Sequence, residues 1–162
     1  MQRAIDVKPS GTWSGDSARS ITLPFEDRHR RRIRMTDDAG SGFLLDLPDA
    51  VLLVGGDGLV LEDGGMITVL AAPEPVADIH CDDQVMAARI AWHIGNRHTP
   101  VQVLDDGTLR IHDDHVMVHM VEGLGARVTR HKAPFEPEGG AYASGHGHSH
   151  DHSQGHGSGH DH

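Results

Sequence analysis

The chain has 162 residues, of which 37% are hydrophobic and 4% aromatic, and it carries a formal net charge of −10. Its length allows one ordinary domain or two small ones, and its acidity argues against nucleic acid as a partner. The sequence has neither an apolar leader nor a run long enough to span a membrane, so we expect a cytoplasmic protein without a membrane partner.

The first part of the chain, residues 1–73, is expected to be a β-rich N-terminal domain. Short apolar runs alternate with turns rich in glycine, aspartate and proline, and none of the runs shows a helical period. The expected strands cover residues 20–23, 30–35, 43–47, 51–54, 59–61 and 66–70. Strands at this spacing predict a small sandwich or barrel.

Residues 74–142 are expected to form a ferredoxin-like domain with the order β-α-β-β-α-β, so the fold class of the chain is α+β. The two helices lie between the first and second strands and between the third and fourth. The middle strands flank a hairpin turn at residues 105–108. The expected strands cover residues 76–80, 101–104, 109–112 and 126–130.

Aspartates can cap both helices, and glycines can end them in a left-handed conformation. The candidates are Asp82 or Asp83 with Gly95 for the first helix, and Asp113 or Asp114 with Gly125 for the second. Residues at helical spacing predict the face that each helix buries. For the first helix these are Val85, Ala88, Arg89 and Trp92, and for the second Met117, Met120, Val121 and Leu124.

Residues 143–162 are expected to be a disordered tail, because they hold seven histidines among small and polar residues and nothing that could anchor a core. Neutral imidazole is a ligand for Ni²⁺, Cu²⁺ and Zn²⁺. The histidines are interspersed with glycine, serine and aspartate, unlike the uninterrupted run of an expression tag. The sequence therefore predicts a metal-binding tail with the candidate ligands His146, His148, His150, His152, His156, His160 and His162.

Three histidines of the second domain are further candidate ligands. His98 follows the first helix, where an imidazole can bind metal or can interact with the last helical carbonyls. His112 and His115 flank two aspartates and could share one ion, or could be exposed side chains beside a helix cap. His119, one turn further along, could extend that site or simply lie on the surface.

The motifs of common enzymes are absent from the sequence. There is no His-Glu-x-x-His pattern, which supplies a helix-borne general base in many zinc enzymes, and no P-loop for GTP. No pair of nucleophile and base stands out either, so we expect no catalytic activity. Cys81 is the single cysteine, which excludes an intramolecular disulfide, and we expect it to be a small core residue.

A basic cluster interrupts the acidic chain near residue 30. Charged residues on an edge strand discourage aggregation between sheets, and we favour this role over a surface for an acidic partner. The cluster should therefore lie on a solvated strand. Its members are Arg28, Arg30, Arg31, Arg32 and Arg34.

Three stretches in the second half carry a specific pattern when they occur in this order. They are residues 91–100, which contain Gly95-Asn96-Arg97-His98, residues 109–116, which contain His112-Asp113-Asp114-His115, and residues 133–142 ahead of the histidine-rich tail. Together they resemble the signature of the UreE family of urease accessory proteins. Residues 25–34 and 69–74 resemble the same family more loosely, so the resemblance covers nearly the whole chain.

The resemblance implies a homodimeric nickel metallochaperone that is not an enzyme. In the family the second domain forms the dimer, the residue matching His98 binds Ni²⁺ from both subunits, and tail histidines complete the coordination. The nickel then passes to a GTPase accessory protein and on to the apo-urease complex. Zn²⁺ and Cu²⁺ are the expected competitors. Asp113 departs from the family pattern, because some members carry a histidine there as a peripheral ligand. Whether His112 and His115 form a site without that histidine is therefore an open question.

Other functions stay open from the residues alone. The main alternative is a histidine-rich nickel or zinc buffer unconnected to urease, which would bind many ions without a specific acceptor. A metal-dependent hydrolase would need an open coordination position and an organised pocket. A metal-sensing repressor would need a helix-turn-helix pattern, which this acidic chain lacks.

Overall fold

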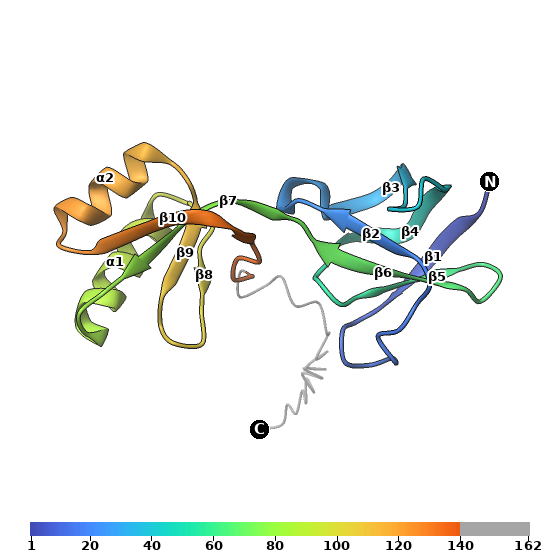
Figure 1. Ribbon diagram of the computed structural model, residues 1–162, viewed down its shortest axis with the longest axis horizontal. Helices are drawn as coiled ribbons and strands as arrows, with labels where there is room; N and C mark the ends of the chain where they lie inside the picture. Colours follow the sequence, from blue (N-terminus) through green and yellow to red (C-terminus); the bar gives the residue numbers. More distant parts are fainter. Residues whose placement is uncertain (140–162) are drawn as a thin grey trace, which may run out of the picture.

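Residues 1–139 are described in this computed structural model, and they form two sheets (Figure 1). Each sheet has its own hydrophobic core. The predicted tail and its seven histidines lie outside the described residues. The first sheet has six strands in the order β2-β6-β5-β1-β4-β3. The elements are β1 (Arg3–Lys8), β2 (Ser20–Leu23), the short 3-10 helix η1 (Phe25–Asp27), β3 (His29–Thr36), β4 (Gly42–Leu52), β5 (Gly58–Leu61) and β6 (Met66–Ala71).

The first sheet curves around one core. Its two edge strands, β2 and β3, approach each other where the backbone amide of Asp38 donates to the carbonyl of Ser20 (2.9 Å). This closure is nearer to the expected barrel than to a sandwich of two stacked sheets. The core is built from Ala4, Ile21, Phe43, Leu45, Leu47, Leu53, Leu59, Leu61, Ile67 and Val69.

Two strands of this sheet differ from the sequence-based expectation. β1 is not apparent in the sequence, because Ala4 is its only buried residue and charged side chains interrupt the alternation. β4 runs through Pro48 and joins two expected strands into one. Its pairing with β3 is interrupted between Asp46 and Val51, so the missing amide of the proline breaks no ladder hydrogen bond.

The basic cluster divides between two environments. β3 is an edge strand, as predicted, and most of the clustered arginines lie on it: Arg30, Arg31, Arg32 and Arg34. Arg28 precedes β3, and the expectation that it is solvated is wrong, because its side chain is 1% exposed. A buried guanidinium needs partners from another part of the chain, which its local sequence does not reveal.

The second sheet has the ferredoxin-like arrangement that the sequence predicts. Its elements are β7 (Pro73–His80), α1 (Gln84–Asn96), β8 (Gln102–Val103), β9 (Leu109–His112), α2 (His115–Gly123) and β10 (Arg127–Pro134). The strand order β10-β7-β9-β8 puts the first and third strands of the domain at the centre of the sheet. β7 begins beside the first sheet and continues into the second (Figure 1).

The predicted helix caps are confirmed at three positions. The carboxylate of Asp83 accepts a hydrogen bond from the amide of Met86 (2.7 Å) at the start of α1. The carboxylate of Asp114 accepts from two amides of the first turn of α2. Gly125 follows the end of α2 with a φ of +100°, the left-handed conformation expected of a glycine there.

The face that α1 buries is not the predicted one. Val85 and Trp92 are 59% and 64% exposed, whereas Ile90 and Ile94 are buried against the second sheet. The predicted face is wrong because α1 carries apolar residues on two sides, and periodicity alone cannot tell which side meets the sheet. The exposed side leaves an apolar surface on the helix that leads to His98.

α2 buries most of its predicted stripe. Met117 and Val121 are buried, and Met120 packs at the margin of the core. Val118 is also buried, while Leu124 is exposed because it is the C-cap and no longer continues the helical spacing. No helix within residues 1–139 is long and apolar enough to cross a membrane.

Candidate metal centre

His98 lies just beyond α1 in a backbone conformation that side chains rarely adopt. Its φ is +55°, and among residues 1–139 it is the only residue other than glycine with a positive φ. Its amide donates to the Gly95 carbonyl (3.0 Å), and the amide of Thr99 donates to the Ile94 carbonyl (3.3 Å), which is the Schellman pattern of a helix end. Glycine usually takes this place, and another residue costs roughly 1–2 kcal/mol there. Gly95, predicted to end the helix, lies within its last turn instead.

The environment of His98 leaves its imidazole available. The side chain is exposed to solvent. The carbonyls of Ile94 and Gly95 in the last turn already accept hydrogen bonds from backbone amides, so the ring is not needed to satisfy them. A residue kept at a backbone position with such a cost is a candidate for a functional role of its side chain.

The chain after β10 returns to the neighbourhood of His98. We call residues 135–139 the exit segment. The amide of Glu138 donates to the Val101 carbonyl (2.8 Å), and the amide of Val103 donates to the Glu138 carboxylate (3.0 Å). Val101 follows His98 by three residues. The exit segment, which ends the described part of the chain, therefore lies beside the loop that carries His98.

His112 lies where the two sheets meet. Its Nε2 is 3.0 Å from Glu74 Oε1, and its ring centroid is 4.2 Å from that of Phe135 and 6.1 Å from that of Phe25. The imidazole is thus held between a carboxylate and two aromatic rings. Because its Nε2 already has a partner, His112 is less available to a metal ion than His98.

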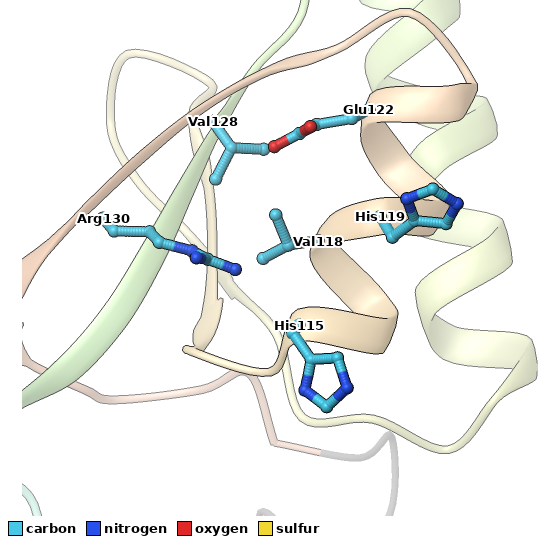
Figure 2. Close-up of a pocket in the computed structure, with 6 residues that line it drawn as sticks. All are labelled: His115, Val118, His119, Glu122, Val128 and Arg130. Carbon is cyan, nitrogen blue, oxygen red and sulfur yellow. The ribbon is translucent and has the colours of Figure 1, made fainter.

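His115 and His119 lie on successive turns of α2 and line one open groove (Figure 2). Their rings point in different directions, and Arg130 and Glu122 bring opposite charges to the groove. The neighbouring Asp113 pairs with Arg130 (3.1 Å). No three histidine, cysteine, aspartate or glutamate side chains within residues 1–139 are arranged to hold an ion. The structure therefore contains no preformed site at His112 and His115 in its described part, and their role as ligands stays a prediction.

A charged network on the open face of the second sheet was not anticipated from the sequence. Asp78 on β7 accepts two hydrogen bonds from Arg110 on β9 (2.7 and 2.9 Å), and its Oδ2 lies 2.7 Å from Nε2 of His131 on β10. The hydrogen bonds from Arg110, which outweigh burial, hold the pKa of Asp78 below its usual range. An aspartate inside an otherwise apolar strand was the signal that could have revealed this network.

Thiolate chemistry has little support in this chain. Cys81 is half-buried just beyond β7, and burial together with the charges of Asp82 and Asp83 raises the pKa of its thiol. A protonated thiol is a poor metal ligand. The available donors are therefore imidazoles and carboxylates, which suit borderline ions such as Ni²⁺, Zn²⁺ and Cu²⁺.

Comparison with known proteins matches both halves of the chain to one family. Residues 3–72 match the family model for the N-terminal domain of the UreE urease accessory protein, and residues 74–162 match the model for its C-terminal domain. The chain belongs to the UreE urease accessory protein family. The family resemblance inferred from the sequence motifs is thereby confirmed.

Individual UreE proteins align with most of the chain. The urease accessory protein UreE of Rhodopseudomonas palustris strain BisB18 is 53% identical over 143 residues, which cover 88% of this chain and 67% of the relative. UreE of Beijerinckia indica is 49% identical over 150 residues, covering 91% of this chain and 86% of the relative. UreE of Rhodobacter capsulatus is 49% identical over 145 residues, covering 90% and 89%.

The three stretches that carry the UreE resemblance fall at defined places in the fold. The first forms the end of α1 and the His98 loop, the second forms β9 and the start of α2, and the third contains the end of β10 and the exit segment. Glu138 of the third stretch bonds to Val101, which directly follows the first stretch, and Phe135 contacts His112 of the second. Proteins of the UreE family are described as urease accessory proteins, which agrees with a helper role.

Proposed function

We propose that this UreE-family protein is a cytoplasmic nickel metallochaperone that holds its Ni²⁺ cargo between the two subunits of a homodimer. His98 of each subunit is the principal ligand. The observation that carries the proposal is the left-handed backbone at His98, where an exposed imidazole is retained at a cost that glycine would avoid.

The position of the exit segment supports coordination by the tail. Its hydrogen bond to Val101 puts Glu138 within about 16 Å of His98, from the Cα spacing of paired strands and of linked residues. His146 follows Glu138 by eight residues, which span up to about 28 Å when extended. Tethered rings reach effective concentrations of about the millimolar range. The tail ligands in this proposal are His146, His148 and His150, with His152, His156, His160 and His162 binding further ions.

The exposed side of α1 supports a homodimer. Val85 and Trp92 leave a large part of their apolar surface in water. Apolar side chains gathered on one face are typical of protein interfaces, and tryptophan is enriched among the residues that dominate binding. Pairing two copies through this side of α1, with the two-fold axis close to the Trp92 end of the helix, would bring both His98 rings toward one interface.

Imidazole coordination suits a carrier that has to release its cargo. Without thiolate the site favours borderline ions such as Ni²⁺ over Cu(I), while Zn²⁺ and Cu²⁺ compete. The proposed ligands belong to two subunits and a tail, so an acceptor can displace them one after another. The acceptor in this proposal is a GTPase accessory protein that passes nickel to the apo-urease complex, in keeping with relatives named as urease accessory proteins.

The remaining histidines of the second domain take smaller roles in the proposal. His115 is exposed and can join an ion that the tail already holds, without breaking a contact. His112 would first have to exchange its contact with Glu74 for the metal. We therefore propose His115 as an auxiliary ligand and His112 as a ligand only when that contact is open.

Calorimetric titration with Ni²⁺ tests the proposal. His98→Ala should remove the tight shared site while leaving the fold intact. His119→Ala is the matched control, because His119 is an exposed histidine of the same domain and is not a proposed ligand. The proposal fails if His98→Ala keeps the affinity and stoichiometry of the unchanged protein.

A nickel or zinc buffer is the second candidate function. The seven histidines of residues 143–162 favour it, because they can bind more ions than a single transfer requires. Cells that lack the GTPase accessory protein distinguish the two functions. A buffer would protect such cells from excess nickel as well as it protects normal cells, whereas a chaperone would support urease only when the GTPase is present.

A further inference from the structure

Arg28 is buried at the place where the two sheets meet. Its side chain is 1% exposed, its Nη1 lies 3.1 Å from Glu136 Oε1, and its Nη2 donates to the Phe135 carbonyl. The guanidinium carbon also lies 5.7 Å from the centroid of the Phe25 ring. Arg28 and Glu136 are 108 positions apart in the chain, so this pair ties the exit segment to the first sheet.

Further contacts hold the exit segment at the same place. The amide of Gly55 donates to Glu136 Oε1 (2.6 Å), and a Cβ at Gly55 would come within 3.0 Å of that oxygen. Phe135 is fully buried, with its ring centroid 5.6 Å from that of Phe25 and 4.2 Å from that of His112. Ionic, backbone and aromatic contacts thus converge on two consecutive residues.

The same two residues lead directly to the contacts beside His98. The amide of Glu136 donates to a side chain of β8 (3.0 Å), and two residues later Glu138 bonds to Val101. The exit segment therefore bridges Arg28 on one side and the His98 loop on the other. Its end is the origin of the histidine-rich tail.

Stability alone does not account for a buried arginine at this point. A buried ion pair is often no more stabilising than apolar residues of the same volume, because the loss of hydration offsets the attraction. The Nε of Arg28 is buried and has no hydrogen-bond partner within residues 1–139, which adds to that cost. The guanidinium instead fixes the orientation of its partners, because its planar fork donates hydrogen bonds to one carboxylate and one carbonyl in a fixed geometry.

We infer that Arg28 is a positioning residue for the metal site: it holds Phe135 and Glu136 so that the tail begins beside His98. The inference rests on the proposed function, since it concerns how tail ligands reach the ion at His98. His146 is eight residues from Glu138 and twelve from Pro134, so release of the exit segment lengthens the stretch between His146 and the nearest anchored residue by half. Effective concentration falls with roughly the −3/2 power of tether length, which lowers that of the tail histidines about twofold.

A double-mutant cycle separates this positioning role from a general effect on the fold. It combines Arg28→Met, which keeps the volume and removes the charge, with a full-length variant in which all seven tail histidines are replaced by glutamine. Ni²⁺ affinity is measured for the four proteins by competition with a chromophoric chelator. In the protein with the native tail, Arg28→Met should weaken the Ni²⁺ affinity about twofold or more. In the variant with the glutamine tail, Arg28→Met should leave the affinity unchanged.

Arg19→Met is the matched control for this cycle. Arg19 also pairs with a buried carboxylate of the first sheet, that of Asp37 (2.7 Å), and no contact joins it to the exit segment in the described chain. Arg19→Met should not change the Ni²⁺ affinity, either with the native tail or with the glutamine tail. If Arg28→Met fails to fold, Glu136→Ala takes its place, because the Glu136 side chain is 33% exposed and its loss removes the same link from the other end.

Two results would overturn the inference. Arg28→Met would weaken the Ni²⁺ affinity equally with the native tail and with the glutamine tail, or it would weaken the affinity with neither tail. The proposed function fails independently if His98→Ala retains full affinity, whatever Arg28→Met does. If His98→Ala loses the ion while the Arg28 variants show no coupling to the tail, only the positioning role is wrong.

Discussion

The backbone amide of Glu138 donates a hydrogen bond to the carbonyl of Val101 (2.8 Å), and Val101 follows His98 by three residues. This contact joins the exit segment to the loop that ends α1. The last described residues are therefore close to the loop that carries His98, although they are distant from it in sequence. Metal binding, dimerisation and stability should all respond to changes around this loop.

Replacing the seven tail histidines with glutamine should reduce the number of Ni²⁺ ions bound per chain and leave dimerisation and secondary structure unchanged. Both hydrophobic clusters are built from residues 4–128, so the substitutions do not touch either core. The site at His98 should keep one ion but hold it more weakly. Calorimetry and circular dichroism measure the two effects, and a loss of secondary structure would show that the tail has a structural role.

His98→Gly should stabilise the metal-free fold while abolishing the tight nickel site. Glycine adopts a positive φ without the steric cost of a side chain, so the free energy of unfolding should rise by roughly 1 kcal/mol. Urea denaturation of the metal-free protein measures this change.

Gly95→Ala is the control for that experiment. Gly95 lies inside α1, and a Cβ there would meet no neighbour within 4 Å, so alanine should also stabilise the protein, by about 0.5–1 kcal/mol. Unlike His98→Gly, it should keep the nickel site. A loss of stability in His98→Gly would contradict the left-handed strain argued for this position.

Trp92→Glu should convert the proposed dimer to a monomer, because a charge would replace the most exposed apolar ring on α1. Leu70→Glu is the control, since Leu70 is an exposed apolar residue (43%) of the first sheet. Light scattering at micromolar concentration compares the two variants. A dimer that survives Trp92→Glu would show that this side of α1 is not the interface.

The metal-free protein should lose stability in acid partly through Asp78. The hydrogen bonds from Arg110 lower the pKa of Asp78 in the folded state below the value of about 3.9 for an unfolded aspartate. The ionised carboxylate therefore contributes stability that is present above about pH 4 and disappears as the pH falls through the lower folded-state pKa.

Asp78→Asn removes that contribution. It should destabilise the protein at neutral pH by roughly 1–3 kcal/mol, because Arg110 is left without its charged partner, and it should flatten the acid side of the stability curve. Thermal melts across the acid range measure both effects. Asp49→Asn, at an exposed position, serves as the control and should leave the curve as it is.

Local signals predicted the elements of the second domain. The caps at Asp83 and Asp114, the hairpin turn at Gly107 and the left-handed Gly125 each act between residues at most a few positions apart. Their effect does not depend on the rest of the fold, so it can be predicted from the sequence. The ferredoxin-like order follows from where these signals fall along the chain.

Which face an element buries was harder to predict. α1 has apolar residues on two sides, and only contact with the second sheet selects Ile90 and Ile94 over Val85 and Trp92. β4 passes through Pro48 because its pairing with β3 is open there, and that pairing belongs to the sheet and not to the proline.

The sequence by itself determined which side chains are chemically able to bind metal: imidazoles after α1, near α2 and in the tail. Only the tertiary structure decided that Arg28 is buried against Glu136 and that His112 is engaged by Glu74, partners that lie 108 and 38 positions away. No local rule links such residues, because burial and charge pairing arise from the packing of two sheets that the chain brings together.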